Sequence, residues 1–483
     1  MVMMKRREVL SWVASPLGGL AAPALHAQAV DISPPMRRLS QYMAQAAGVP
    51  LPADVAEQAK HHVLDTLASM VSGSELEPGL AAKRYAGLHT SLQGATVIGV
   101  KGHHAAEQAA MAHGMMAHAD ETDDSHNRSR THPGCAVVPA ALAVAQTQAC
   151  DGARFLQSVA LGYDVGTRVV MAMGGFDLSY KSSLATHSIG GNFGAAAAAG
   201  GVLGLNDQQM RWLLDYSSQQ SSGILAWRRD TDHIEKSFVF GGMPARNGVT
   251  SALGVHTGWT GVDDIFSGPD HFFQAYAPNA NLALLTQELG TRFEIALTDL
   301  KKWTVGSPIQ GPLDALELIQ KRNPFVADQV RSVQVRLAPS VAAVVNDREM
   351  PDVCLQHLVA VMLEDRYVSF KAAHDKPRMK DPRTLSHRAK VALISDESLV
   401  PLLPVRVAVV DIELTNGQRW SERVSAVRGT PRNPMTRQEV IDKATDLMAP
   451  ILGRENTRKI VESVYRLEQV ADIRAWSALL HPV

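Results

Sequence analysis

Residues 191–205, GNFGAAAAAGGVLGL, constrain the fold of this 483-residue chain more than any other stretch. Glycine and alanine make up most of the segment, so a helix here carries little side chain on any face. Most helical stability in a folded protein comes from tertiary packing. A helix of this composition is therefore expected to be buried and closely contacted by its neighbours. The segment predicts the centre of an all-helical domain.

The sequence around this segment, from residue 34 to residue 298, has a mainly helical pattern. Residues 34–73 predict two helices separated by Pro and Asp, and residues 103–119 predict another. Pro133 stands where a helix can begin, because its missing N–H is not needed there. Aromatic residues make up only 5% of the chain, which favours closely packed helices over a large β-sandwich.

The pattern changes near residue 300. Residues 331–340, 389–396 and 404–427 alternate or are rich in β-branched residues, and Asn416-Gly417 predicts a hairpin turn. Thr436 and Glu439 form a capping-box pattern that begins another helix. We therefore predict a mostly α protein with a helical domain over 34–298 and a smaller α+β lid domain over 299–454. Residues 455–483 are expected to pack back on the helical domain.

The N-terminal residues 1–29 have the layout of a secretory signal, with a basic start, an apolar middle and a small-residue end. Arg6-Arg7 resembles a twin-arginine signal, and Ala27-Gln28-Ala29 offers a cleavage site. The apolar stretch is short for a spanning helix. We expect an exported, periplasmic protein with no membrane segment in its mature form. An uncleaved N-terminal anchor is the alternative.

Charge and cysteine content exclude several classes of protein. The formal net charge is −1, so nothing in the composition points to nucleic acid or an anionic membrane as a partner. Three scattered cysteines are too few for a disulfide framework and form no CxxC pair. A zinc ribbon or iron–sulfur centre is therefore not expected.

Residues 117–135, AHADETDDSHNRSRTHPGC, concentrate titratable side chains between two predicted helices. Arg128 and Arg130 lie among the acids, so a self-neutralised, solvated loop is one interpretation. A metal site is another, because His and Asp suit zinc, manganese or iron. However, the spacing matches neither an HExxH nor an HxH…D signature. On a connection between helices, the same side chains could instead point into a cleft.

Three further positions carry candidate chemistry. His187 stands near the N-terminus of the small-residue helix, where a helix end favours an anion. Lys236 precedes a Gly-rich turn, where it could bind a carboxylate or transfer a proton. Lys301 and Lys302 lie at the predicted domain junction, a favoured place for ligands. Each signal alone is weak, since a helix cap or a surface lysine explains it equally well.

Taken together and in order, these motifs resemble the MmgE/PrpD family. The family pattern appears here as HADETDDSH followed by HPG, as His187 before the Ala-rich helix, and as KSFVFGGMPARNG. It continues as KKW at the domain boundary and as GTPRNP near the end. The resemblance covers nearly the whole chain after residue 30. Known members include 2-methylcitrate dehydratase, cis-aconitate decarboxylase and iminodisuccinate epimerase.

The resemblance implies a large helical domain with an α+β lid, a homodimer, no metal or organic cofactor, and a small di- or tricarboxylate substrate. It implies catalytic roles for a set of residues in which Glu121 replaces the family Asp: His132, His187, Lys236, Glu121 and Asp124. It implies substrate binding by Asp123, Ser125 (in place of Thr), Lys301 and His357. His357 stands where the family has Tyr, and Gln310 lies near a position that is often His. These departures indicate a subgroup with its own ligand.

The chemistry implied by the family is proton movement at a carbon next to a carboxylate. Lys236 and Lys301 would stabilise the negative charge that develops there. His132 or His187 would carry the proton, with Asp123 or Asp124 fixing the tautomer. We expect a cofactor-independent lyase, specifically a hydro-lyase. The alternatives are a decarboxylase or an epimerase of the same family, a non-catalytic carboxylate-binding protein, and a metal-dependent hydrolase.

Overall fold

The computed structural model of the protein describes residues 32–481, so the predicted signal, residues 1–29, lies outside the described residues. The chain is mostly α-helical with one smaller α+β part. The first part contains a two-stranded sheet, β1 (Ala95–Val97) and β2 (Val100–His104). Its helices are α1 (Pro34–Ala46), α2 (Ala53–Gly73), α3 (Glu77–Ala86), α4 (Ala106–Ala117), α5 (Gly134–Thr147), α6 (Gly152–Met173), α7 (Gly175–Lys181), α8 (Thr186–Leu203), α9 (Asp207–Gln219), α10 (Ile234–Ser237), α11 (Met243–His256) and α12 (Phe272–Tyr276).

The second part is the α+β part, and a third group of helices follows it. The α+β part consists of α13 (Ser307–Arg322), β3 (Val330–Leu337), α14 (Pro339–Val345), α15 (Leu355–Asp365), α16 (Phe370–Ala373), α17 (Pro382–Arg388), β4 (Val391–Ser395), β5 (Ala408–Leu414) and β6 (Arg419–Val424). The last helices are α18 (Arg437–Leu452), α19 (Arg454–Val464) and α20 (Ile473–Ser477). Short helices connect these elements: η1 (Leu225–Arg229), η2 (Phe238–Gly242), η3 (Leu282–Leu285), η4 (Glu294–Leu297), η5 (Ala327–Gln329), η6 (Pro351–Val353), η7 (Pro377–Lys380), η8 (Glu397–Leu402), η9 (Leu467–Gln469) and η10 (Ala478–Leu480).

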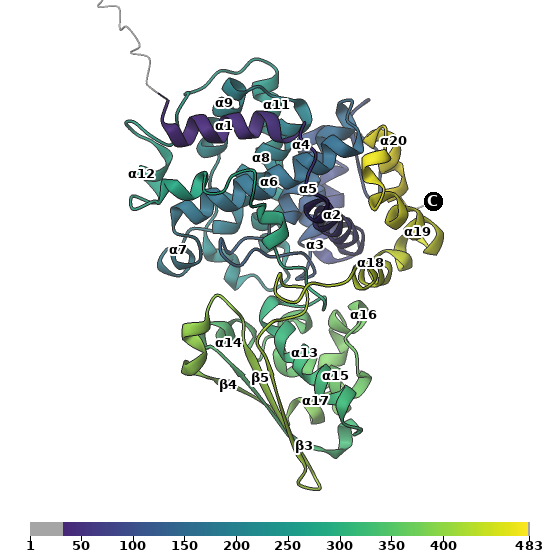
Figure 1. Cartoon of the computed structure of the whole chain (residues 1–483). Helices are drawn as coiled ribbons and strands as arrows, with labels where there is room; N and C mark the ends of the chain where they lie inside the picture. The colour runs from purple at the N-terminus through teal and green to yellow at the C-terminus, as the bar shows by residue number, and fades with distance from the viewer. Residues whose placement is uncertain (1–31, 482–483) are drawn as a thin grey trace, which may run out of the picture. The chain divides into compact units, whose positions relative to one another are not determined.

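The small-residue helix α8 lies at the centre of the helical part (Figure 1), and it is buried along almost its whole length. A Cβ added to Gly166 of α6 would lie 2.3 Å from the carbonyl oxygen of Gly190. A Cβ added to Gly248 of α11 would lie 2.4 Å from the amide nitrogen of Ala196. Both neighbours therefore approach α8 backbone to backbone, which only glycine permits at these points. The predicted buried, closely contacted helix is confirmed.

The α+β part is built on a four-stranded sheet in the order β4-β3-β5-β6. β3 pairs parallel with β4 and antiparallel with β5, and β5 pairs antiparallel with β6. Asn416-Gly417 forms the predicted hairpin turn, with Gly417 at φ 87°. The sheet and the helices α13 and α15 share their own hydrophobic core.

The chain returns to the helical part after the sheet, and the yellow helices α18–α20 lie beside it in Figure 1. Thr436 and Glu439 form the predicted capping box of α18. Val440, Ala444 and Leu447 of α18 belong to the core of the helical part. The boundary predicted at residue 454 therefore falls after a helix that already packs with the first part. We use "helical part" below for α1–α12 together with α18–α20.

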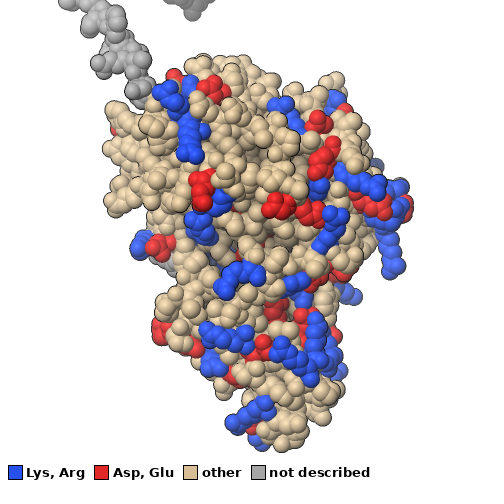
Figure 2. Space-filling view, in the orientation of Figure 1, with Lys and Arg blue, Asp and Glu red and all other residues tan. Residues whose placement is uncertain are grey.

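Acidic and basic side chains are interspersed on the face shown in Figure 2, in agreement with the near-zero net charge. Within residues 32–481, no helix is both long enough and apolar enough to span a bilayer.

A buried ion pair attaches α18 to the rest of the helical part. Lys443 Nζ lies 2.6 Å from Asp65 Oδ1 on α2 and donates to the carbonyl oxygen of Thr122 at 3.0 Å. Burial raises the pKa of Asp65 even with this ammonium beside it. We expect Lys443→Met to lower the free energy of unfolding by about 3–5 kcal/mol, because it strands a buried carboxylate. Urea denaturation of the full chain measures this loss.

Arg458→Met is the matched control for Lys443→Met. Arg458 pairs with Glu455 and Glu462 on the exposed face of α19. Solvent screens exposed pairs of this kind, so they contribute little to stability. If both variants lost the same small amount of stability, water would reach Asp65 and the pair would not anchor α18.

Candidate active site

The titratable segment after α4 is buried. Every residue from His118 to His126 is nearly inaccessible to solvent, including four carboxylates that are each at most 6% exposed. The solvated-loop interpretation of this segment is therefore wrong. Buried charges require partners, and the structure supplies them from α8, α10 and the segment that carries Lys301. We call the following residues the titratable cluster: His118, Glu121, Asp123, His132, His187, His233, Lys236 and Lys301.

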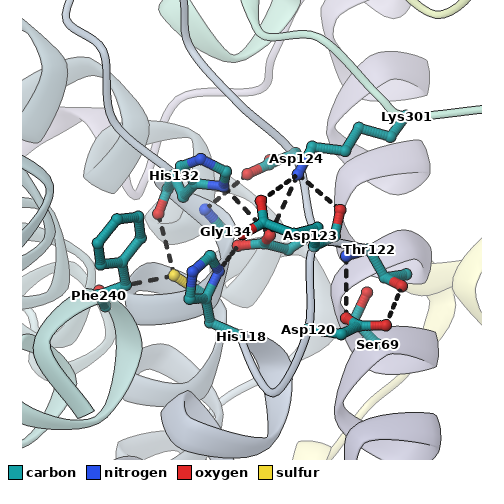
Figure 3. Close-up of polar contacts among 12 residues, drawn as sticks. Ser69, His118, Asp120, Thr122, Asp123, Asp124, His132, Gly134, Phe240 and Lys301 are labelled. Carbon is teal, nitrogen blue, oxygen red and sulfur yellow. Dashed lines mark hydrogen bonds and ion pairs between the residues drawn. The ribbon is translucent and has the colours of Figure 1, made fainter. Parts of the chain in front are cut away.

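Asp123 lies at the centre of this cluster (Figure 3). Its Oδ2 accepts a hydrogen bond from His118 Nδ1 at 2.9 Å, and its Oδ1 accepts one from His132 Nδ1 at 3.1 Å. Lys301 Nζ lies 3.7 Å from Oδ1. Burial alone would raise the pKa of Asp123, but the two imidazoles and the ammonium outweigh it and hold that pKa well below its usual range. Asp123 is therefore an ionised carboxylate that can only accept hydrogen bonds.

An ionised Asp123 fixes the tautomers of both histidines, because each must present an N–H through Nδ1. Burial lowers the pKa of His118 to about 4, so this imidazole is neutral near pH 7. The side chain of His132 is 11% exposed, whereas that of His118 is completely buried. His132 Nε2 makes no hydrogen bond to another described residue. His132 thus offers a free lone pair, oriented by a carboxylate, at the solvent-accessible edge of the cluster.

Glu121 is the second carboxylate of the cluster. Its Oε1 contacts Lys236 Nζ and lies 3.2 Å from His233 Nε2. Lys301 Nζ donates to the backbone carbonyl of Glu121 at 2.6 Å and lies 3.8 Å from Oε2. Burial would raise the pKa of Glu121, but Lys236 foremost, with His233 and Lys301, holds it well below its usual range. A carboxylate thus already occupies the position where two ammonium groups converge.

Two aromatic rings form one wall of the cluster. Phe240 of η2 stacks on His187 with 3.9 Å between ring centroids, and on His118 with 4.4 Å. Trp227 stands edge-on to Phe240, and Lys236 Nζ lies 5.4 Å from the Trp227 ring and 5.2 Å from Phe240. Burial, and then the positive charge of neighbouring groups, holds the pKa of His187 well below its usual range. His187 is therefore a neutral ring in an apolar wall.

Local sequence explains how these elements meet. η2 is a π-helical turn between α10 and α11, a feature often found at functional sites. A Cβ added to its Gly241 would lie 2.1 Å from the carbonyl oxygen of Gly114 on α4. Glycine at both positions lets the two backbones touch. This contact brings Phe240 against His118, which caps the end of α4.

Asp124, expected to be catalytic, is not in the cluster. Its Oδ1 accepts from the backbone N–H of Gly134 at 3.0 Å, and its Oδ2 accepts from His62 Nδ1 at 2.8 Å and from Tyr163. Asp123 and Asp124 are adjacent in sequence, but their carboxylates accept hydrogen bonds from different groups. Asp124 thus connects its own segment to the start of α5 through Gly134 and to α2 through His62.

Ser125 and His357, expected to bind substrate, also lie elsewhere. Ser125 pairs through its backbone with Asp299. It lines a cavity between residues 125–128 of the helical part and residues 404–406 and 425–432, which we call the junction cavity. His357 is completely buried on α15, and both its ring nitrogens lack hydrogen-bond partners. The structure therefore places neither side chain in the titratable cluster, and His357 is buried on α15 in the α+β part.

Three residues near Glu121 and Asp123 were missed by the sequence prediction. His118 stands three residues before Glu121, and His233 stands three residues before Lys236. Their closeness to chosen residues was an available signal. His374 comes from the C-terminal end of α16, and no sequence pattern linked it to this segment. Its Nε2 lies 2.8 Å from Asp120 Oδ2, and its Nδ1 donates to the carbonyl oxygen of Phe370 at 2.7 Å.

The pair His374–Asp120 makes stability depend on pH. Burial lowers the pKa of His374, but Asp120 and then Asp352 outweigh this and raise it from 6.5 to about 9. A raised pKa stabilises the fold fully below the unfolded value of 6.5, and this stabilisation is lost as pH rises through about 9. The difference between the unfolded and folded pKa values of His374 corresponds to about 3 kcal/mol of folding free energy. We expect His374→Gln to lose this pH dependence between pH 6.5 and pH 9, measured by urea denaturation.

Other histidines also titrate, so the informative quantity is the difference between parent and variant at each pH. His103→Gln, at an exposed position on β2, is the matched control and should follow the parent. If His374→Gln and the parent ran parallel from pH 6.5 to pH 9, His374 would be uncharged in the folded protein.

Two groups of side chains place three potential metal ligands within 4.8 Å of one another: His118, Asp123 and Cys135, and His118, Glu121 and His233. In both groups the carboxylate already faces lysine ammonium groups. Burial, and then Asp123, raises the pKa of Cys135 well above its usual value, so its thiol keeps its proton and is a poor ligand. The cluster therefore suits a bound anion better than a cation. The expectation that no metal or organic cofactor is required stays a prediction.

Comparison with known proteins places this geometry in a family. Residues 37–285 match the MmgE/PrpD N-terminal domain, and residues 303–469 match the MmgE/PrpD C-terminal domain. The chain is 25% identical over 465 residues to the cis-aconitate decarboxylase-like protein oryM of Aspergillus oryzae, covering 89% of this chain and 94% of that protein. It is 22% identical to the cis-aconitate decarboxylases of Aspergillus terreus, over 89% of this chain and 92% of the relative, and of Mus musculus, over 88% and 89%. The chain belongs to the MmgE/PrpD family.

Proposed function

We propose that this protein is a lyase that acts on a small di- or tricarboxylate by moving a proton at a carbon next to a carboxylate. One observation carries the proposal: an imidazole, His132, is held by the ionised Asp123 beside the ammonium groups of Lys236 and Lys301. An oriented base next to buried positive charge is what abstraction or return of such a proton requires. The family membership supports a lyase of the dehydratase or decarboxylase type.

In this mechanism, a substrate carboxylate displaces Glu121 from Lys236. Glu121 occupies the position where Lys236, His233 and Lys301 converge, so an incoming carboxylate meets the same donors. His132 Nε2 then takes the α-proton or returns it to carbon, and Asp123 stabilises the imidazolium. The two lysines stabilise the enolate-like anion that forms in either direction.

Two outcomes are chemically balanced in this site. In decarboxylation, the bond to the departing carboxylate breaks and carbon dioxide leaves. His132, first protonated at Nε2 by solvent and stabilised as the imidazolium by Asp123, then delivers that proton to the carbanion. In dehydration, His132 takes the α-proton, and one of the two ammonium groups of the cluster, Lys236 or Lys301, protonates the departing hydroxyl group to release water. The sequence motifs favour dehydration, as in 2-methylcitrate dehydratase. The decarboxylase names of the relatives favour decarboxylation, with cis-aconitate as the first substrate to test.

The test is ¹H NMR in deuterium oxide with purified protein and a panel of di- and tricarboxylates that includes cis-aconitate. Loss of carbon dioxide with one deuterium incorporated would identify a decarboxylase. Elimination of water would identify a dehydratase, and α-deuterium exchange alone an epimerase-type reaction. Tight binding of an acid without exchange or elimination would contradict the proposal and indicate a carboxylate-binding protein. Activity that depends on stoichiometric metal in the purified protein would contradict the mechanism above.

We also propose that the protein is exported to the periplasm and forms a homodimer. The sequence of residues 1–29 supports export to the periplasm, and the family tendency supports a homodimer. A reporter fused to the full chain would remain in the cytoplasm if the export proposal were wrong. Light scattering of the purified protein would show a monomer if the dimer proposal were wrong.

A further inference from the structure

The junction cavity is a candidate binding site that the proposed reaction does not use. Its volume is about 270 Å³, close to the lower end of about 300–1,000 Å³ that is typical of small-molecule pockets. Glu121, Asp123, His132 and Lys236 do not line it. Lys301 is the one member of the titratable cluster that lines the cavity, and Ser125, which also lines it, stands two positions after Asp123.

Positive charge converges on this cavity from both parts of the chain. Arg128 comes from the segment that leads to His132, and Arg406 and Arg432 come from the α+β side. The side chain of Arg128 is 46% exposed, and its carboxylate neighbour Glu294 is 3.9 Å away. Arg432 is exposed and forms no ion pair with another residue in the described range 32–481. Guanidinium groups bind carboxylates through paired N–H donors.

The only carboxylate that lines the cavity within the described residues is Asp299. Asn127 donates a hydrogen bond to its Oδ2. Burial raises the pKa of Asp299 to about 7, although Arg406 lowers it. A carboxyl group with this pKa is protonated in a large fraction of molecules near neutral pH. It can then donate a hydrogen bond to an anion instead of repelling it.

The remaining wall is largely apolar. Leu297, Leu300, Val405 and Val427 line it together with two prolines. A bare inorganic ion would leave this surface in contact with water, whereas a ligand with a hydrocarbon body would cover it, which is favourable. The cavity therefore combines hydrogen-bond donors for an anion with an apolar surface.

We propose that the junction cavity binds a small organic dianion with an apolar body, such as an aromatic or branched dicarboxylate, at a site separate from the titratable cluster. The ligand contacts the helical part through Arg128 and the α+β part through Arg406 and Arg432. It thereby bridges the two parts next to the segment that carries Asp123. Binding of this dianion does not depend on the reaction proposed above, because the three arginines that would hold it are not members of the titratable cluster.

The test is a ¹⁹F NMR titration of the full chain with 4-fluorophthalate, an aromatic dicarboxylate. We expect saturable binding that Arg432→Gln and Arg406→Gln each weaken at least tenfold. Arg331→Gln is the matched control, because Arg331 is exposed on β3, pairs with Glu413 and lies outside the cavity. Arg331→Gln and Lys236→Met should bind 4-fluorophthalate like the parent. Neutral 4-fluorobenzyl alcohol should bind at least tenfold more weakly than the dianion.

Three results would overturn the proposal. Binding unchanged in both cavity variants would show that the arginines do not hold the dianion. Binding lost in Lys236→Met but kept in Arg432→Gln would place the dianion in the titratable cluster. Displacement by inorganic phosphate at equal concentration would show that the apolar wall contributes nothing. Because Arg432 is exposed, its replacement leaves the core intact, and circular dichroism checks the fold of each variant. An inactive enzyme that still binds 4-fluorophthalate would contradict only the proposed reaction.

Discussion

Replacing Lys236 by methionine should lower the rate of proton transfer or decarboxylation by at least about 10²–10³-fold, the effect of removing one group that stabilises developing negative charge. Lys236 contacts Glu121 in the free protein and lies against Trp227 and Phe240. A substrate carboxylate that displaces Glu121 takes over this ammonium group. Its loss should raise KM as well as lower kcat. Deuterium exchange followed by NMR, over a range of substrate concentrations, measures both.

Lys302→Met is the control for Lys236→Met. Lys302 follows Lys301 in sequence but pairs with Glu317 at 2.6 Å and lies 4.4 Å from the Trp303 ring. Its removal deletes an equal charge near the domain junction without touching the cluster. If the two variants lost activity equally, a general electrostatic effect would explain the result and Lys236 would have no place in the site.

His132→Asn should lower the same rate by about 10²–10⁴-fold, the range for loss of a general base or acid. The structure distinguishes His132 from His187, which the sequence could not do. His132 is oriented by Asp123 and partly exposed, whereas His187 is a neutral ring stacked on Phe240. His187→Asn should therefore cost less than about tenfold, the effect of one neutral hydrogen bond. Single-turnover exchange rates compare the two variants directly.

Asp123→Asn tests the orienting role of the carboxylate. His118 and His132 donate to different oxygens of Asp123. An amide keeps only one of these oxygens and presents an NH2 donor in place of the other, so the two histidines can no longer both be held as Nδ1–H donors, and the proton position on His132 is no longer fixed. The rate should fall although His132 is still present. His103→Asn, on the surface of β2, is the control for histidine loss. A larger loss in His187→Asn than in His132→Asn would reverse the assignment of the base.

The sequence by itself determined the family, the helical character of residues 34–298 and the strands that follow. These follow from local patterns: small residues that permit close helix packing, β-branched alternation, and a capping box at Thr436. The motif order also identified Glu121, His132, His187, Lys236 and Lys301, and the structure brings these five together. Their catalytic roles remain for the experiments above to establish.

Tertiary structure alone decided which of two neighbouring acids contacts His118 and His132. Asp123 and Asp124 are adjacent and chemically alike, yet one holds His132 and the other holds the start of α5. It also decided that α18 packs with the helical part, and that His374 pairs with Asp120 across 254 positions of sequence. Local patterns report propensity and periodicity. They carry no information on which distant group compensates a buried charge, because that depends on how the packed elements bring the partners together.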